Sequence, residues 1–295
     1  MKIREWIAFL SLTLIWGASF LWIKIAVQEV SPYSLVVFRI MLGLLGLVVF
    51  FPLKKPKIPR RLRTWVDLAI LGVFSSAVPW LLISWAEQSI DSALAGVLNG
   101  TVPLFTIVIA HLFIHDDRMT MGRVMGLLAG FAGVVVLTQR DGGGEVLAAG
   151  LNRNLLGQGA MLLASLSYAI SGVHARRHLR DVGALNQAFF SMAFSLAILL
   201  VVGRVAGQSL GLPREIDTWV ALGWLGILGA GVASFVFYYL LHAIGPTRAS
   251  LVTYTIPVVG VTLGVLVLHE RLDWALAVGT FLIVSGVWVV NRKTS

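Results

Sequence analysis

One segment of this chain occurs twice, and both copies lie in stretches apolar enough to cross a membrane. The first copy, Ala95-Gly-Val-Leu-Asn99-Gly-Thr-Val-Pro103, aligns with the second, Ala249-Ser-Leu-Val-Thr253-Tyr-Thr-Ile-Pro257. After a one-residue gap the match resumes, pairing Asp117-Arg-Met-Thr120 with Glu270-Arg-Leu-Asp273, Gly126 with Gly279, and Gly133 with Gly286. The chain is therefore expected to fold as two related halves.

The composition is that of a polytopic membrane protein. Hydrophobic residues make up 58% of the chain and charged residues 13%, with a mean hydropathy of +0.88, whereas soluble domains are about half apolar and a quarter charged. A transmembrane helix needs about 20 mainly apolar residues. Ten runs meet this requirement, at 6–26, 33–52, 65–86, 93–114, 121–138, 155–175, 184–203, 218–241, 248–268 and 274–291.

Basic residues between the runs predict the orientation, because cytoplasmic loops retain Lys and Arg. With a cytoplasmic N-terminus, 16 basic residues fall inside and 6 outside, and Arg39 lies within the second run. We therefore expect a multi-pass protein of the cell (inner) membrane with both termini cytoplasmic. Each half holds five runs, an odd number, so the second half enters the membrane upside down. The predicted fold class is all-α, with ten transmembrane helices in two inverted five-helix repeats.

The longest polar stretch divides the chain nearly in half. Residues 140–154 contain three consecutive glycines and many polar side chains, and they are expected to form an external connector. The first repeat then spans 1–139 and the second 155–295. The first run follows Lys2 and Arg4, as a signal peptide would. Because it is long, rich in tryptophan and lacks a small-x-small cleavage site, we expect it to stay as a helix.

Several functional classes are disfavoured. The net charge of +9 comes with no basic run that alternates with aromatic residues, so nucleic acid is not an expected partner. There are no cysteines, and we expect no metal-ligand histidine pair, no paired catalytic carboxylates and no nucleotide-binding glycine loop. We therefore expect that the protein is not an enzyme and that it has no catalytic residues, no cofactor and no bound metal.

The first run carries a recognisable set of residues. Trp16-Gly-Ala-Ser-Phe20 is followed by Lys24, Pro32 and Arg39, and the fourth-run proline, the acidic-x-hydrophobic-x element and the Gly-x6-Gly pair of the fifth run all recur in the second half. As a set, and over essentially the whole chain, these residues resemble the EamA (ten-helix exporter) branch of the drug/metabolite transporter superfamily. The resemblance implies ten helices, cytoplasmic termini and export of small metabolites.

The second half departs from this opening motif. Tyr168-Ala-Ile-Ser171 stands in place of Trp16-Gly-Ala-Ser19, Arg176 stands for Lys24, and Ser191 replaces Arg39. The two halves are therefore not expected to contribute equal contacts to a shared site.

The duplicated prolines suggest where such a site lies. Because proline has no N–H, Pro103 releases the carbonyl of Asn99, and Pro257 releases that of Thr253. Both carbonyls are expected about 6 Å from the membrane midplane, on opposite sides. Irregular backbone at this depth is tolerated where it faces a cavity or other protein. The alternative is a packing kink satisfied by a neighbouring Ser or Thr.

Other polar and aromatic residues at this depth are candidates for the wall of a substrate cavity, although any one of them can serve packing alone. They are Trp16, Ser19, Trp80, Tyr168, Ser171 and Tyr238. Spans one, three and four, with six, eight and nine, are then expected to line the cavity.

Charges within the runs are few. Arg39 is expected to snorkel or to form a structural or gating ion pair with Glu87 or Asp91, with attraction of a substrate carboxylate as an alternative. Lys24 is expected to anchor the outer end of the first span. His111 and His242 lie near the cytoplasmic ends of their spans and are candidates for titration. No carboxylate lies centrally in any run, which favours a neutral or zwitterionic solute over a bulky organic cation.

The sequence therefore predicts a secondary carrier working by alternating access, with the bilayer and a small-molecule substrate as partners. Amino acids come first among the expected substrates, on the resemblance above. A broad-range multidrug or solute exporter is the alternative within transport, and a membrane-embedded enzyme is the alternative outside it. Oligomeric state is left open, with a monomer among the options.

Overall fold

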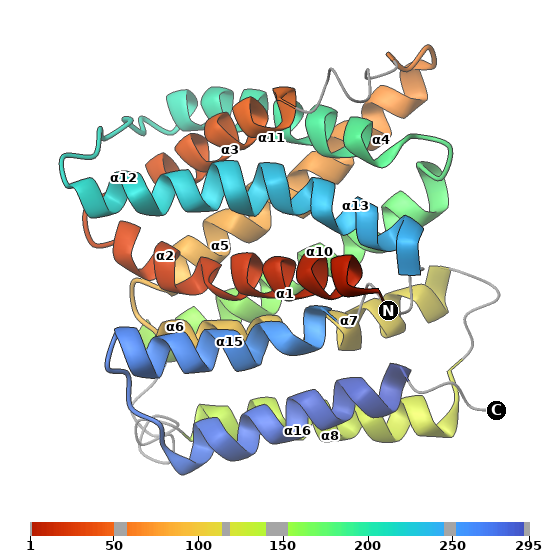
Figure 1. Ribbon diagram of the computed structural model, residues 1–295, viewed down its shortest axis with the longest axis vertical. Coiled ribbons are helices and arrows are strands. Elements are labelled where there is room, and N and C mark those ends of the chain that lie inside the picture. Colours follow the sequence, from red (N-terminus) through yellow and green to blue (C-terminus); the bar gives the residue numbers. More distant parts are fainter. Residues whose placement is uncertain (1, 50–57, 114–118, 140–152, 245–251, 292–295) are drawn as a thin grey trace.

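The computed structural model describes residues 2–49, 58–113, 119–139, 153–244 and 252–291, and these form helices without any strand. In chain order the helical elements are α1 (Ile3–Gly17), α2 (Ser19–Ala26), α3 (Pro32–Val48), α4 (Leu62–Gly72), η1 (Val73–Ala77), α5 (Val78–Ala86), α6 (Ser92–Asn99), α7 (Val102–Phe113), α8 (Met121–Thr138), α10 (Arg153–His178), α11 (Ala184–Val205), α12 (Ile216–Gly223), η2 (Trp224–Val232), α13 (Ala233–Ile244), α15 (Val252–Val267) and α16 (Trp274–Asn291). Figure 1 shows them stacked in layers with their axes roughly side by side.

Each of the ten expected runs coincides with one helix or with a series of helical segments. Six of these are long and apolar enough to cross a membrane by themselves, and four shorter apolar helices account for the other runs. The first run is helical from Ile3 to Ala26, with a short break at Ala18. The prediction of an all-α membrane protein with ten spans is therefore confirmed.

The fifth spans of the two halves, α8 and α16, pack against each other at one edge of the molecule (Figure 1). A Cβ added to Gly133 would lie 2.8 Å from the carbonyl oxygen of Gly279, and one added to Gly286 would lie 2.5 Å from that of Gly126. In the sequence alignment Gly126 matches Gly279 and Gly133 matches Gly286. In the structure the contacts are crossed, because Gly133 meets Gly279 and Gly286 meets Gly126. This reciprocal contact requires antiparallel helices related by a two-fold axis, as inverted repeats demand.

The fourth and ninth spans cross in the same manner. A Cβ on Gly96 of α6 would lie 3.6 Å from the Cα of Gly260 in α15. A Cβ on Gly100 would lie 3.1 Å from the ring of Pro257, so the two copies of the duplicated segment touch each other. Small residues permit such close backbone approach in membrane helices.

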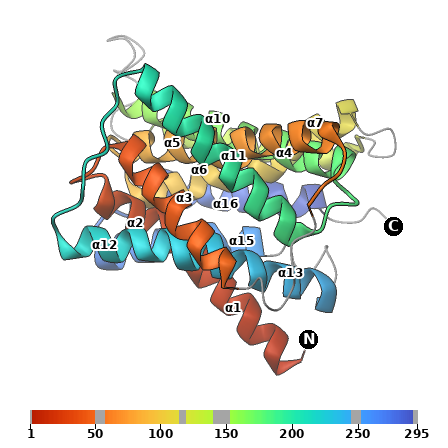
Figure 2. The same cartoon turned by 90° about the horizontal axis from the view of Figure 1, so that it is seen from above.

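The third and eighth spans each contain a π-helical segment, η1 and η2. Figure 2 shows α3 crossing the span that contains η2, where a Cβ on Gly46 would lie 3.4 Å from the Cα of Gly231. π-Helical turns are rare and are often found at functional sites. Their occurrence in equivalent spans was not expected from the sequence.

Several parts of the sequence interpretation lie outside the described residues. They include almost all of the connector at 140–154, the acidic residue Asp117 of the first repeat, and the side chains of Tyr238 and His242.

Candidate functional site

Three of the predicted site residues come together from three different spans. The guanidinium carbon of Arg39 in α3 lies 4.0 Å from the ring centroid of Trp80 in α5, a cation–π arrangement. The hydroxyl of Tyr168 in α10 interacts with the Trp80 side chain, and it also interacts electrostatically with the Arg39 guanidinium. Arg39 is only 7% exposed, and its Nε atom donates no hydrogen bond within the described part of the chain. A guanidinium so placed retains donors for a ligand.

Glu87, the residue that directly follows α5, is fully buried. Neither of its carboxylate oxygens accepts a hydrogen bond from the described residues. The charges of Lys24, Glu270 and Arg39 all act on it. In the described residues no ion pair within 4.0 Å joins Arg39 to Glu87, so that pairing stays a prediction. Buried charges are costly unless a partner compensates them, which makes both groups candidates for substrate contact.

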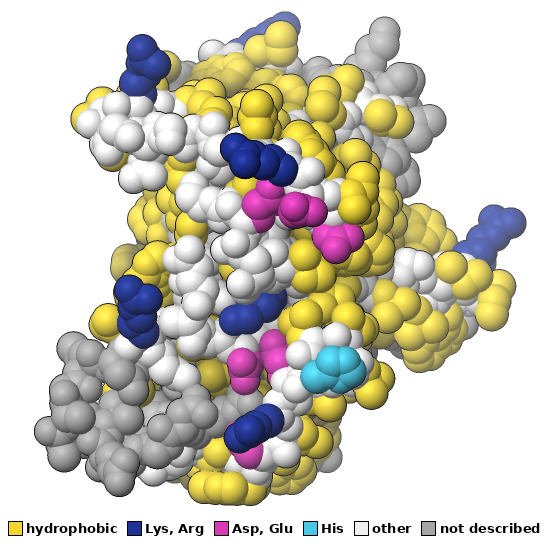
Figure 3. Space-filling model, turned by 90° about the vertical axis from the view of Figure 1, so that its left-hand side faces the viewer, with side chains coloured by type: hydrophobic (Ala, Val, Ile, Leu, Met, Phe, Trp, Pro, Cys, Tyr) yellow, Lys and Arg dark blue, Asp and Glu magenta, His cyan; other side chains and the backbone are white. Residues whose placement is uncertain are grey.

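Lys24 links this region to a polar pocket. Its ammonium donates to the carbonyl oxygens of Glu87 and Ile90, at 2.8 and 2.7 Å. Lys24 also lines a pocket of about 990 Å³ where α2 and α15 end and α12 and α16 begin. The other residues lining it are mostly polar or charged: Ile25, Gln28, Glu29, Asp91, Glu215, Asp217, Thr218, Leu268, His269, Glu270, Arg271 and Asp273. Figure 3 looks onto this end of the molecule and shows acidic and basic side chains gathered there.

Two carboxylates at the rim of the pocket each reach from one half to a helix of the other. Glu29 accepts hydrogen bonds from the backbone N–H groups of Arg214 and Glu215, just before α12 begins. Glu270 accepts from the first two N–H groups of α6, those of Ser92 and Ala93, at 2.8 and 2.9 Å. Anionic side chains stabilise the N-terminal ends of helices in this way.

The rim contact of Glu29 also affects its ionisation. A hydrogen bond from Thr218, followed by that from the backbone of Arg214, lowers the pKa of the Glu29 carboxyl below its usual value. The ionised carboxylate is therefore the form that holds this contact.

The first copy of the duplicated segment breaks the fourth span, as Pro103 was expected to do. α6 ends at Asn99 and α7 begins at Val102. The carbonyl that gains a cross-helix partner is that of Leu98, which accepts from Ser165 of α10 at 3.2 Å and from Thr101 at 2.6 Å. The side-chain oxygen Oδ1 of Asn99 is buried and accepts no hydrogen bond within the described residues, so it is available to a polar ligand.

The second copy of the duplicated segment has the same threonine-to-carbonyl hydrogen bond, but its helix is not interrupted. Pro257 lies inside α15, and the hydroxyl of Thr255, which aligns with Thr101, donates to the carbonyl of Val252 at 2.7 Å. Thr255 also pairs with Thr13 of α1 at 2.8 Å. Thr13 occupies the position in the first span that Ser165 occupies in the sixth. The first span of each half is thus hydrogen-bonded to the fourth span of the other.

Trp16 packs against the eighth span rather than beside Trp80. Its indole N–H donates to the carbonyl of Gly229 in η2 at 3.1 Å, and Trp224 returns the contact by donating to the carbonyl of Ile15 at 3.2 Å. The ring of Trp16 lies 5.5 Å from that of Phe237. Trp16 therefore fastens α1 to η2.

The first π-helical segment makes a matching contact. In a π-helix the N–H of Pro79 would be the donor for the carbonyl of Phe74, but proline has none. The carbonyl of Phe74 accepts instead from Ser167 of α10, at 2.9 Å. Each π-helical segment therefore binds the first span of the other half.

The other predicted residues are not grouped into one pocket. Ser19 is buried and donates to the carbonyl of Ile15 in the preceding turn, and Ser171 donates to that of Tyr168. Thr253 is partly buried in α15, and the side chain of Tyr238 lies outside the described residues. The assignment of these residues to a substrate site stays a prediction.

Sequence reasoning missed several residues that join the halves, namely Thr13, Phe74, Thr101, Ser165 and Thr255. The Thr-x-Pro pattern shared by both copies was a usable signal for two of them. Sequence reasoning also overlooked His174 and His178, which lie with Asp67 at the end of α10 far from the pocket, with ligand atoms within 4.8 Å of one another.

Comparison with known proteins gives a consistent result. The model of the EamA-like transporter family matches residues 4–139 and again residues 155–292. The uncharacterized inner membrane transporter YedA of Escherichia coli K12 is 29% identical over 94% of this chain and 88% of its own length. The uncharacterized transporter YoaV of Bacillus subtilis is 25% identical over 97% of this chain and 96% of its own.

More distant similarity extends to plants and to a solved structure. A WAT1-related chloroplastic protein of Arabidopsis thaliana is 25% identical over 97% of this chain and 69% of its own. One crystal structure matches 98% of both chains with a TM-score of 0.68 at 21% identity, which shows a common fold.

Proposed function

Because the chain belongs to the EamA-like transporter family, we propose that this membrane transporter is a secondary carrier that exports small amphipathic metabolites, amino acids first among them. It works by alternating access, with the substrate held between two inverted repeats, 1–139 and 155–295, joined by a connector at 140–154. Bond-making chemistry is not part of the proposal.

The observation that carries the substrate class is the pair of buried, unsatisfied charges. Arg39 keeps an unused donor beside Trp80, and Glu87 keeps both carboxylate oxygens unused within the described residues. An amino acid carries one group for each of them, since its carboxylate suits the guanidinium and its ammonium suits Glu87. The rings of Trp80 and Tyr168 then face the apolar part of the substrate. A zwitterion compensates both charges at once, which a neutral solute does not.

The helix contacts support the mechanism. The first span of each half contacts the fourth and the π-helical span of the other half through one or two hydrogen bonds at each contact. Such bonds are worth about 0.6–2 kcal/mol each in membranes, so they can exchange as the halves rock. The pocket at the end of α2 leads toward Glu87 through Lys24 and forms the entrance on one side.

We place the protein in the cell inner membrane, with both termini cytoplasmic and the pocket facing outward. The bias of basic residues toward one side supports this orientation. The chain has no cysteine, so single-cysteine variants test it directly. Gln28→Cys at the pocket should react with an impermeant maleimide on intact cells, and Arg180→Cys should react only after permeabilisation. The reverse pattern overturns the orientation.

A broad-range exporter is the second candidate, and the aromatic contacts between the halves favour it. Trp22 lies 5.7 Å from Trp224, and Trp16 lies 5.5 Å from Phe237. Aromatic surfaces of this kind suit flat apolar solutes.

Counterflow in proteoliposomes separates the two candidates. Vesicles loaded with an unlabelled amino acid should accumulate the labelled one transiently, and vesicles loaded with the corresponding hydrocarbon amine or carboxylic acid should do so far less. Counterflow of planar apolar compounds, with none for any amino acid, favours the broad-range exporter. Lack of counterflow for every small solute overturns transport by exchange.

A further inference from the structure

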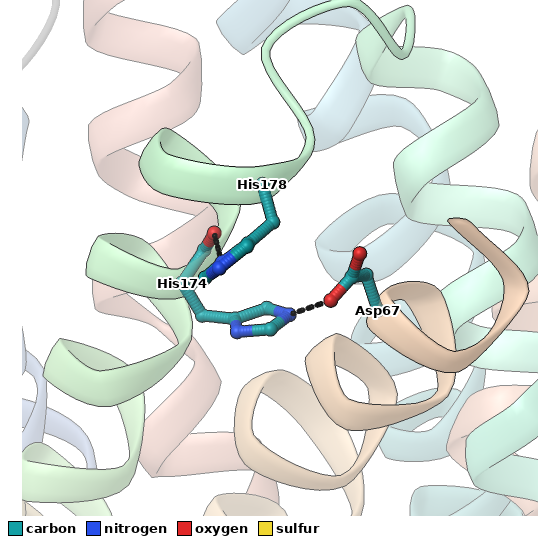
Figure 4. A group of neighbouring side chains, drawn as sticks. All are labelled: Asp67, His174 and His178. Carbon is teal, nitrogen blue, oxygen red and sulfur yellow. Dashed lines mark hydrogen bonds and ion pairs between the residues drawn. The ribbon is translucent and has the colours of Figure 1, made fainter. Parts of the chain in front are cut away.

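Three titratable side chains meet where α4 begins and α10 ends (Figure 4). Asp67 lies in the second turn of α4, and His174 and His178 lie in the last turns of α10. One ligand atom from each residue lies within 4.8 Å of the other two. These residues are not part of the substrate site proposed above.

The local sequence brings the two rings together. Positions four apart fall on one face of a helix, and the ring centroids of His174 and His178 are 4.7 Å apart. Histidines with this spacing on one helix are a familiar pair of zinc ligands. The Nδ1 atom of His178 lies 3.3 Å from the carbonyl oxygen of His174, which leaves its Nε2 atom for a ligand (Figure 4).

Asp67 adds an oxygen from the other half of the chain. Its Oδ1 atom lies 3.3 Å from Nε2 of His174, and the two side chains are 11% and 15% exposed. The Nε2 atom is buried and is not aligned for a hydrogen bond, despite the short distance.

The 3.3 Å spacing of these two atoms also suits two ligands of one metal ion. Around a tetrahedral zinc with bonds of about 2.0–2.2 Å, neighbouring ligand atoms lie about 3.3–3.5 Å apart. Their lone pairs point at the metal and not at each other. His174 and Asp67 already have this spacing, and the exposed side chain of His178 needs only a small rotation to complete three ligands.

We propose that Asp67, His174 and His178 bind a divalent transition-metal ion, with Zn²⁺ the best match, and that the ion ties α4 of the first half to α10 of the second. Two imidazoles and one carboxylate are a ligand set that zinc prefers, and water takes the fourth position on the exposed side. In the orientation proposed above, the site lies at the cytoplasmic end.

The regulatory consequence rests on the proposed carrier function. Alternating access requires this end to open as the halves move apart. An ion that bridges α4 and α10 stabilises the arrangement in which this end is closed, because it binds that state with all three ligands. Zn²⁺ should therefore slow exchange.

Binding is tested first, without any transport assay. The purified protein, carrying no polyhistidine tag, is titrated with Co²⁺, whose four-coordinate complexes have intense visible absorption. One equivalent should produce these bands, and Zn²⁺ should abolish them. Asp67→Asn, His174→Gln and His178→Gln should each weaken binding at least about tenfold. His269→Asn, an exposed histidine at the opposite end, is the matched control and should bind as the wild type does.

The outcomes separate the site from its consequence. Equal Co²⁺ spectra for the wild type and the His174→Gln variant, with both proteins monodisperse, overturn the metal site whatever transport shows. Binding with unchanged counterflow overturns the clamp. Zinc inhibition in the wild type that is lost in Asp67→Asn supports both. If the wild type shows no counterflow of any solute, the carrier proposal fails while the binding result stands.

Discussion

The two copies of the duplicated segment share their hydrogen bonds but differ in their backbone. In both, a threonine two residues before the proline donates to the carbonyl three residues before the threonine. A hydroxyl from the first span of the other half also bonds there, to the carbonyl in the first copy and to the threonine hydroxyl in the second. Yet α6 ends at Asn99, whereas α15 continues through Pro257. Gly100 stands at the break, and Tyr254 stands at the matching position. Because glycine destabilises a helix interior, the same proline breaks one copy and is accommodated in the other.

The same contrast holds for charge. Arg39 lies over Trp80 in the first half, whereas its counterpart Ser191 donates to a carbonyl of its own helix, and a Cβ added to Gly72 would collide with its backbone carbonyl. One half places a cation over an aromatic ring at this position, and the other uses the position for close helix packing. Duplication thus preserved the frame while the side chains at equivalent positions diverged.

The largest expected effect comes from the symmetric part of the frame. Gly286→Ala would place a Cβ 2.5 Å from the carbonyl oxygen of Gly126 and 2.6 Å from the N of Gly130. Both are backbone atoms, so α8 and α16 must separate, at a cost of about 1–3 kcal/mol or more. The thermal unfolding midpoint in detergent should fall clearly. Gly122→Ala, which meets nothing within 4 Å, is the control. Equal midpoints would refute the packing of the fifth spans.

The break itself is tested by exchanging its determinants. Tyr254→Gly should weaken α15 by about 1 kcal/mol, through the backbone entropy of glycine. Gly100→Ala should cost a comparable amount, since its Cβ would crowd the carbonyl of Val97 at 2.9 Å and Pro257 at 3.1 Å. Thermal midpoints of both variants provide the measurement. A stabilised Gly100→Ala protein would mean that the break is not required by packing.

Removing the hydroxyl contacts should lower the stability of the protein by a smaller amount, which differs between the two copies. Thr255→Val leaves the buried hydroxyl of Thr13 without its partner, so it should cost about 1 kcal/mol. Thr101→Val should cost less, because Ser165 still donates to the carbonyl of Leu98. The double variant Thr13→Val/Thr255→Val should recover much of the loss. Additive losses in the double variant would argue against a direct Thr13–Thr255 bond.

The rim contact of Glu29 should have the smallest effect, and one confined to acid. The folded-state pKa of this carboxyl is lowered, so its stabilisation is fully present above the pKa of a free glutamate. It is lost as the pH falls through the lowered value. The difference in thermal midpoint between the wild type and Glu29→Gln should persist at neutral pH and vanish only once the pH has fallen below the lowered pKa. A difference that grows in acid would contradict this contact.

Most of the fold could be predicted from the sequence, because the signals for it are local. Apolar run length predicted the ten spans, and the duplicated segment predicted two related halves. The π-helical segments could not be predicted, since they depend on which span packs against Phe74 and Gly229. Pro79 removes a donor, but only the fold shows that Ser167 replaces it.

The site was only partly predictable. Arg39, Trp80 and Tyr168 were each identifiable as polar or aromatic groups at membrane depth, but their meeting depends on how three spans pack. Glu87 was predicted only as a partner of Arg39, and its complete burial was not foreseen. Burial depends on long-range contacts, which the sequence pattern does not encode.

The central claim is that Arg39 and Glu87 each bind one charge of a zwitterion. It is tested most directly by a thermodynamic cycle that combines altered substrates with altered proteins. Binding of an amino acid, its amide and the acid that lacks the amine is measured by calorimetry for the wild type, Arg39→Gln and Glu87→Gln. Removing the substrate carboxylate should weaken wild-type binding about 10- to 100-fold, with little further loss in Arg39→Gln. Removing the substrate ammonium should likewise weaken wild-type binding, with little further loss in Glu87→Gln. Losses that add independently for both residues would contradict the claim.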